Sequence, residues 1–118
     1  MDKRLIDGDS AHRKTFPIMR GVIDYFPDAL AAIAQVSYVG NLKHNPGEPM
    51  HHSRGEKNVP HVDEIIRHLI QRGGVDTVEI DGVVYQVRHT ALAAWRALAL
   101  LQEELEAAHG LTLPRAAK

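Results

Sequence analysis

The 118-residue sequence contains no cysteine. This absence excludes a disulfide framework, a thiol nucleophile and any zinc site that depends on thiolate ligands. Histidine and carboxylate side chains are then the only strong metal ligands that the chain can offer. The lack of cysteine also fits a protein of the reducing cytosol.

The sequence also lacks a marked excess of charge of one sign and any long hydrophobic run. It has 14 basic and 15 acidic residues, and its pI is near 6.7. This balance gives no electrostatic case for duplex nucleic acid or a membrane surface as the main partner, and it leaves open a small anionic ligand. No stretch approaches the roughly 18 apolar residues that span a bilayer. Because residues 1–10 carry charges where a signal peptide has its apolar core, we expect a cytoplasmic protein.

The length allows one domain and is too short for two. Residues 1–15 are polar and without clear period, which predicts a flexible N-terminal arm. Residues 16–110 form the predicted single helical domain, and its first part is apolar but interrupted by proline and glycine. Residues 111–118 are a predicted C-terminal tail.

Two helices and a hairpin are predicted around the middle of the chain. Pro27 and Asp28 favour the first turn of a helix over about 27–39, and Gly40-Asn41 is typical of a helix end. A second helix is predicted from an N-cap near Asn58 to the Gly73-Gly74 pair. The alternating pattern that follows, VDTVEIDGVVYQV, centres on Asp81-Gly82 and predicts a type I′ hairpin.

The last predicted helix is the longest. It runs from His89 to His109 with apolar residues at helical spacing and ends at Gly110. Its single tryptophan, Trp95, is either a platform for a purine base or a core residue, and the apolar neighbours favour the core. The fold class is therefore mainly α, a small helical domain with one short β-hairpin before the last helix.

The second helix has a distinct division of faces. At 100° per residue, an apolar stripe is flanked by His61, Glu64 and His68 on one edge and by Asp63 with Arg67 on the other. Either edge can line a cleft. The stripe consists of Val62, Ile65, Ile66, Leu69 and Ile70.

Five of the eight histidines lie in the stretch 40–69, which also holds most of the loop-forming residues. A long loop of this kind is usually functional or disordered. Its cations and glycines could bind phosphate together, although a solvated basic loop explains the pattern as well. The residues concerned are Lys43, His44, Gly47, Arg54, Gly55 and Lys57.

Few carboxylates are placed to bind a divalent cation. Asp63, Glu64 and Asp76 are the central ones, and as plain surface charges they would carry no function. Asp63 could simply pair with Arg67 one turn away, which is worth about 0.3 kcal/mol. His61 and His68 are open to two interpretations, as helix-boundary residues or as groups for metal binding or proton transfer.

Three segments, FPDALAAIAQVSYVGNLKHNPGEP, PHVDEIIRHL and RHTALAAWRALALLQEELE, resemble the phage-encoded dATP/dGTP diphosphohydrolase domain family. That family is similar to the MazG-like all-helical nucleotide pyrophosphohydrolases. The resemblance covers about residues 16–106. It implies cleavage of a purine deoxynucleoside triphosphate to monophosphate and pyrophosphate with Mg²⁺ or Mn²⁺, in the host cytoplasm if the protein is phage-encoded.

The resemblance also implies roles for individual residues. Catalytic roles fall to Asp63, His61 and His68, and substrate binding falls to Asn41, Lys43, His44, Arg54 and Arg67. The metal ligands that it implies are Asp63, Asp76 and His89. Helical periodicity adds Glu64 as a fourth candidate ligand, and Asp63 is expected to matter more than Glu64. The ExxE and ExxD patterns of MazG-type enzymes are absent from the helices where they are expected, so the ligand set stays open.

Two further classes of function stay open beside the enzyme. The chain could bind a nucleotide without turnover, or it could be a structural helical phage protein. The absence of a GxxxxGK[ST] phosphate-binding loop favours release of pyrophosphate over single phosphate transfer. The apolarity of the helices predicts a homo-oligomer.

Overall fold

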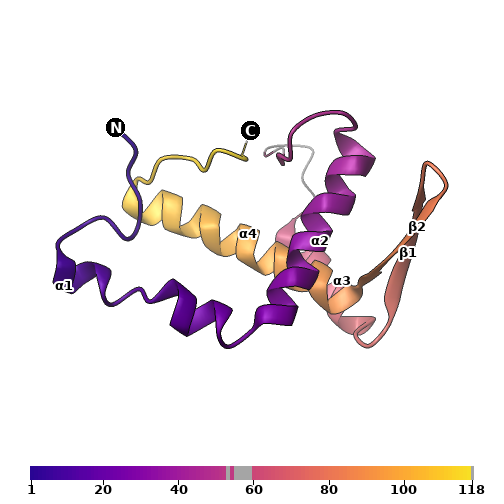
Figure 1. Cartoon of the computed structure of the whole chain (residues 1–118), viewed down its shortest axis with the longest axis horizontal. Coiled ribbons are helices and arrows are strands. Elements are labelled where there is room, and N and C mark those ends of the chain that lie inside the picture. Colours follow the sequence, from indigo (N-terminus) through magenta and orange to yellow (C-terminus); the bar gives the residue numbers. More distant parts are fainter. Residues whose placement is uncertain (53, 55–59, 118) are drawn as a thin grey trace.

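The computed structural model describes residues 1–52, 54 and 60–117. Helices dominate it, and one antiparallel hairpin stands at the end of the molecule away from both termini (Figure 1). The predicted fold class, mainly α with a hairpin before the last helix, is confirmed. In chain order the elements are α1 (Ser10–Arg13), the π-helical turn η1 (Met19–Ile23), α2 (Pro27–His44), α3 (His61–Ile70), β1 (Val75–Ile80), β2 (Val83–Arg88) and α4 (His89–His109).

The hairpin and the last helix form as predicted. Asp81 and Gly82 both have positive φ, 52° and 79°, as a type I′ turn requires. β1 pairs with β2 from Val75↔Arg88 to Ile80↔Val83. Helix α4 ends at Gly110 in the left-handed conformation, where the absence of a Cβ removes the strain.

The first long helix extends beyond its predicted end. The stop at Gly40-Asn41 is wrong, because α2 continues to His44 and Asn45 caps it by donating from its backbone N–H to the Asn41 carbonyl. Gly40 is absorbed into the helix interior without left-handed backbone, at a cost of about 1 kcal/mol relative to alanine. As a result Lys43 and His44 lie in the last helical turn, where their charge suits the helix dipole, rather than in the loop.

Helix α3 is shorter than predicted, from His61 to Ile70. Pro60 immediately precedes it, and the predicted N-cap Asn58 lies outside the described residues. The chain turns after Gln71, with Gly73 at a φ of 90°. In the described part of the chain, no helix combines the length and the apolarity needed to cross a bilayer.

The core is small and lies where α2, the end of β2 and the first half of α4 meet. Its buried apolar side chains are Val39, Val87, Ala91 and Ala93. Tyr38 of α2 meets Tyr85 of β2 edge to face, with ring centroids 6.1 Å apart. Alanines on α2 and α4 let these helices approach closely, which reduces the apolar area that the core can bury.

The two termini meet along the outer end of α4 (Figure 1). The backbone N–H of Lys3 donates to Thr112 Oγ1 over 2.7 Å, and the Arg4 guanidinium donates to the Thr112 carbonyl over 2.6 Å. The short helix α1, capped by Asp9, lies within the segment for which the sequence predicts no regular element.

Candidate functional site

Polar side chains follow the contact between α3 and α4, which run antiparallel. His61 of α3 meets Glu103 of α4 at one end, and His68 meets His89 at the other. The two contacts are seven residues apart on α3 and fourteen apart on α4. Because seven residues make about two helical turns, each helix carries the contacts on one face. We call this row the seam; it consists of His61, Glu64 and His68 on α3 and His89, Arg96 and Glu103 on α4.

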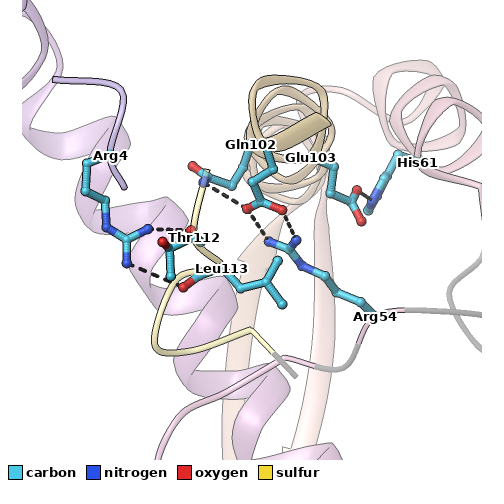
Figure 2. Close-up of polar contacts among 8 residues, drawn as sticks. Arg4, Arg54, His61, Gln102, Glu103, Thr112 and Leu113 are labelled. Carbon is cyan, nitrogen blue, oxygen red and sulfur yellow. Dashed lines mark hydrogen bonds and ion pairs between the residues drawn. The ribbon is translucent and has the colours of Figure 1, made fainter. Parts of the chain in front are cut away.

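His61 and Glu103 form a carboxylate–imidazole pair (Figure 2). The distance from His61 Nε2 to Glu103 Oε2 is 2.6 Å, and Arg96 lies 3.4 Å from His61 Nδ1. An arginine can only donate, so Nδ1 of a neutral His61 accepts and Nε2 donates to the carboxylate. The His61 side chain is nearly buried, whereas that of Glu103 is 33% exposed.

Arg54 reaches from the loop before α3 to Glu106, one turn beyond Glu103 on α4 (Figure 2). Both terminal nitrogens of Arg54 bond to the Glu106 carboxylate, one of them over 3.0 Å, and Gln102 also donates to it over 2.9 Å. The hydrogen bond from Arg54 holds the pKa of Glu106 below its ordinary value. Glu106 is therefore ionised and firmly held at neutral pH.

A hollow of about 450 Å³ is lined in part by Arg54 and Gln102, the two residues that bond to Glu106. Its volume is within the range of small-molecule sites. Trp95 and His52 meet in it edge to face with centroids 5.1 Å apart, and the indole N–H donates to Ser37 over 2.9 Å. Most of the remaining lining is aliphatic, from α2, α4 and the C-terminal segment, including Ile33, Leu98, Ala99, Leu105 and Ala116.

His52 connects the hollow to the charged pairs. Burial lowers the pKa of His52, the nearby Arg54 cation lowers it further, and the charges of Glu103, His61 and Arg96 also act on it. Its ring is therefore neutral at neutral pH and packs edge to face against Trp95 as an aromatic group. We call this end of the seam, with the residues around it, the hollow end; it comprises His61, Arg96 and Glu103 of the seam together with His52, Arg54, Trp95 and Glu106.

The other end of the seam is drier. His68 and His89 are buried, 5% and 8% exposed, and their Nδ1 atoms lie 3.0 Å apart with the rings stacked. Arg67 lies 3.2 Å from His68 Nε2, so a neutral His68 accepts there and donates from Nδ1 to His89. Burial lowers the pKa of His68, and the Arg67 cation lowers it further. We call this part the hairpin end; it comprises Glu64, Arg67, His68 and His89.

The structure separates the neighbouring carboxylates Asp63 and Glu64. Glu64 bonds to Arg67 over 2.6 Å and lies 3.6 Å from His68, and the bond to Arg67 lowers the pKa of Glu64. Asp63 is exposed and makes no side-chain hydrogen bond or ion pair with another described residue. The expected pairing of Asp63 with Arg67 is thus replaced by Glu64 with Arg67, because the step of 100° turns the two carboxylates apart. The catalytic role assigned to Asp63 stays a prediction.

The predicted substrate-binding residues of α2 do not join the seam contacts. Asn41 organises the following loop: its amide donates to the Glu48 carbonyl over 2.9 Å and accepts from Asn45 over 3.1 Å. Lys43 and His44 are exposed on the last turn of α2. The loop residues Gly55 and Lys57 lie outside the described residues.

The predicted metal ligands are distributed along the chain. Asp76 is exposed on β1, and its charge acts on His68 and Arg67 at the hairpin end, which also contains Glu64 and His89. Within residues 1–52, 54 and 60–117, no three His, Asp or Glu side chains converge as a metal site would require. The Mg²⁺ or Mn²⁺ requirement stays a prediction.

The sequence analysis assigns no role to four residues of the site: Glu103, Glu106, Arg96 and His52. The seven-residue spacing from His89 through Arg96 to Glu103 puts one histidine, one arginine and one carboxylate on the same face of α4. That spacing was available as a signal, since a polar row on an otherwise apolar helix must face either solvent or a polar partner. The pairing of Arg54 with Glu106 across 52 residues had no local signal.

No family model, no curated protein and no solved structure matches this chain. The candidate site is therefore defined by its own residues and geometry.

Proposed function

We propose that this chain hydrolyses purine deoxynucleoside triphosphates to the monophosphate and pyrophosphate, at the hollow end of the seam. The carrying observation is that Arg54, which is paired with Glu106, lines a hollow with an aromatic wall. The charges of the His61–Glu103 pair act on His52, another residue of the lining. The resemblance of the sequence to nucleotide pyrophosphohydrolases supports the same reaction.

The His61–Glu103 pair supports a role in activating water. Glu103 holds the imidazole in one orientation through Nε2, and Nδ1 faces only the longer contact with Arg96. A histidine oriented in this way can accept a proton at Nδ1, and the carboxylate stabilises the imidazolium that results. In the proposed reaction the water oxygen attacks the α phosphorus, His61 takes the proton, and the bond to the β-phosphate oxygen breaks with loss of pyrophosphate.

The remaining groups support recognition of the two halves of the substrate. Arg96, beside His61, and Arg54 supply guanidinium groups for phosphate oxygens. The aliphatic and aromatic lining of the hollow suits the face of a purine, with Trp95 and His52 as the aromatic wall. No phosphate contact is assigned to Lys43 and His44, which are exposed on α2.

The donor chemistry at this end fits Mg²⁺ or Mn²⁺ arriving with the nucleotide. Mg²⁺ in nucleotide enzymes is commonly held by one or two carboxylates together with phosphate oxygens, rather than by a cage of protein ligands. Glu103 would hold it, because its side chain is partly exposed and only Oε2 bonds to another described residue. When bound, the ion neutralises charge on the triphosphate.

A second candidate is a protein that binds the nucleotide without turnover. It is favoured by the ion pairs themselves, because Glu103 and Glu106 are already engaged by His61 and Arg54. A carboxylate that stays paired keeps the seam together and does not act on a substrate.

Incubation of the purified protein with each of the four deoxynucleoside triphosphates, with Mg²⁺ or Mn²⁺, separates these functions. Anion-exchange chromatography is expected to show dAMP or dGMP and an equal amount of pyrophosphate, with little product from pyrimidine nucleotides or in the presence of a chelator. Release of orthophosphate alone would contradict the proposed reaction. Thermal stabilisation by dATP without product would instead support a protein that binds the nucleotide without turnover.

A further inference from the structure

Helix α3 turns its charged edge toward the rest of the protein and leaves apolar side chains outside. Val62, Ile66, Leu69 and Ile70 are 54%, 52%, 42% and 74% exposed. At 100° per residue these four fall within an arc of about 100°, the width of a core-facing stripe on a helix of a globular protein. We call them the outer stripe. The stripe has the pattern of a buried face, but none of the residues that the structure describes covers it.

The whole chain exposes more surface than a compact monomer of its mass, as is expected when a partner is missing. The chain exposes 8535 Å², whereas a compact monomer of its mass exposes about 6,400 Å². The radius of gyration is 15.8 Å, against about 13.5 Å for a compact chain of this length. Exposed apolar side chains in residues 18–26 contribute to this excess as well as those of α3. Counted from two chains, the excess of about 2,100 Å² per chain is within the range of obligate homodimer interfaces.

We infer that the outer stripe is the centre of a two-fold interface with a second copy of this chain, in which two α3 helices pack antiparallel. A two-fold interface requires a surface that is complementary to itself. The edge of the stripe meets this requirement, because Asp63 and Arg67 carry opposite charges four residues apart, and the Arg67 side chain is 57% exposed although it bonds to Glu64. In an antiparallel pair centred between them, Asp63 of each copy lies opposite Arg67 of the other.

The same two-fold axis also brings the apolar residues of the two copies together. The midpoint of the stripe from Val62 to Ile70 is Ile66, and the midpoint of Asp63 and Arg67 is one residue away. Apolar contacts and charges are therefore satisfied by one arrangement. Of these interface residues, only Arg67 also belongs to the hairpin end. The hollow end shares no residue with this interface, so the interface is independent of the function proposed there.

Light scattering after size-exclusion chromatography tests this inference. The wild-type protein is expected to elute with twice the chain mass of 13.1 kDa. Ile66→Lys is expected to raise the dissociation constant by about 30-fold or more, as for a residue at the centre of an interface. The matched control is Val84→Lys on the hairpin, because Val84 is 58% exposed and Lys there would face Glu79 across the strands.

A cysteine cross-link gives a second test that does not depend on destabilising the protein. The chain has no native cysteine, so Ile66→Cys introduces a single thiol close to the proposed axis, where two copies are within reach of a disulfide. Mild oxidation is expected to give a covalent dimer with Ile66→Cys and mostly monomer with Val84→Cys. A monomeric wild-type protein at about 100 µM, well above the dissociation constant expected of an interface this large, would overturn the inference. Equal cross-linking of the two cysteine variants would overturn it as well.

Discussion

The two ends of the seam use the same kinds of side chain for different purposes. At the hollow end, His61 is bonded to the partly exposed Glu103, and Arg54 is bonded to Glu106 beside a hollow of about 450 Å³. At the hairpin end, His68 is buried against a second histidine. The first arrangement keeps charge and space next to each other, as a reactive site needs. The second excludes water, which favours the neutral form of His68.

The comparison shows that a histidine on a helix edge takes its role from the helix it faces. His61 and His68 lie on the same edge of α3, seven residues apart, and nothing in their own neighbourhood in the sequence tells them apart. Glu103 and His89, on the opposing face of α4, make the difference. A change at Glu103 is therefore expected mainly to lower turnover, whereas a change at His68 is expected mainly to alter how stability depends on pH.

The largest effect is expected from Glu103→Gln. This change keeps the size of the side chain but removes the charge that orients His61 and would hold the metal, so turnover is expected to fall by about 10²-fold or more. Asp63→Asn on α3 is the comparison, because the exposed position of Asp63 predicts that most of the activity is kept, whereas the resemblance implies that it is lost. Rates measured against Mn²⁺ concentration decide this point. Loss in the Asp63 variant with normal turnover in the Glu103 variant would restore the assignment that the resemblance implies.

An intermediate effect is expected from Trp95→Ala. Trp95 is half-buried and its indole bonds to Ser37, so the free energy of unfolding is expected to fall by about 2 kcal/mol, below the range for a fully buried tryptophan. Ser37→Ala removes only the hydrogen-bond acceptor and is expected to cost about 1 kcal/mol. Urea denaturation followed by circular dichroism measures both. Equal losses in the two variants would show that the hydrogen bond, and not the packing of the ring, supports this wall of the hollow.

The smallest effect is expected from pH at the hairpin end. Burial lowers the pKa of His68 below that of the unfolded chain, so the unfolded state binds the proton more readily. The stabilisation from His68 is therefore present above the unfolded pKa and is lost as pH falls through the folded one. Four charged or titratable groups surround His68: Glu64 and Arg67 from α3, His89 from α4 and Asp76 from β1.

Melting temperatures between about pH 7.5 and about pH 5 test this prediction. The decrease is expected to be smaller for His68→Gln than for the wild-type protein, because glutamine does not titrate. His109→Gln, an exposed histidine at the end of α4, is the control and is expected to follow the wild type. A decrease of the same size in all three proteins would place the acid sensitivity elsewhere.

Much of the fold could be predicted because its signals are local. The Asp81-Gly82 turn and the Gly110 cap each require left-handed backbone, and both formed where expected. The end of α2 was wrong because Gly40 is only a weak stop when the following residues continue the helical hydrogen bonds to Asn45. Helical periodicity also grouped His61, Glu64 and His68 correctly on one edge, since this depends only on the geometry of one helix.

The site could be predicted only in part because its partners are distant in the sequence. The pairing of His61 with Glu103 spans 42 residues, and that of Arg54 with Glu106 spans 52. Contacts between residues so far apart produce no periodic pattern in the sequence. The apolar stripe of α3 was identified, but its four outer residues remain uncovered, because the charged edge of the helix packs against α4 instead.

Nucleotide binding in the hollow is the central claim, and a residue that fills the hollow tests it most directly. Ala99 lines the hollow, whereas Ala97 is exposed on the same helix and does not. We would measure by calorimetry the affinity for a dATP analogue with a methylene bridge between the α and β phosphorus atoms, in the presence of Mg²⁺. If the nucleotide binds in the hollow, Ala99→Phe weakens binding by about 10-fold or more, about 1.4 kcal/mol, while Ala97→Phe binds like the wild-type protein. Equal affinity in all three proteins would contradict it.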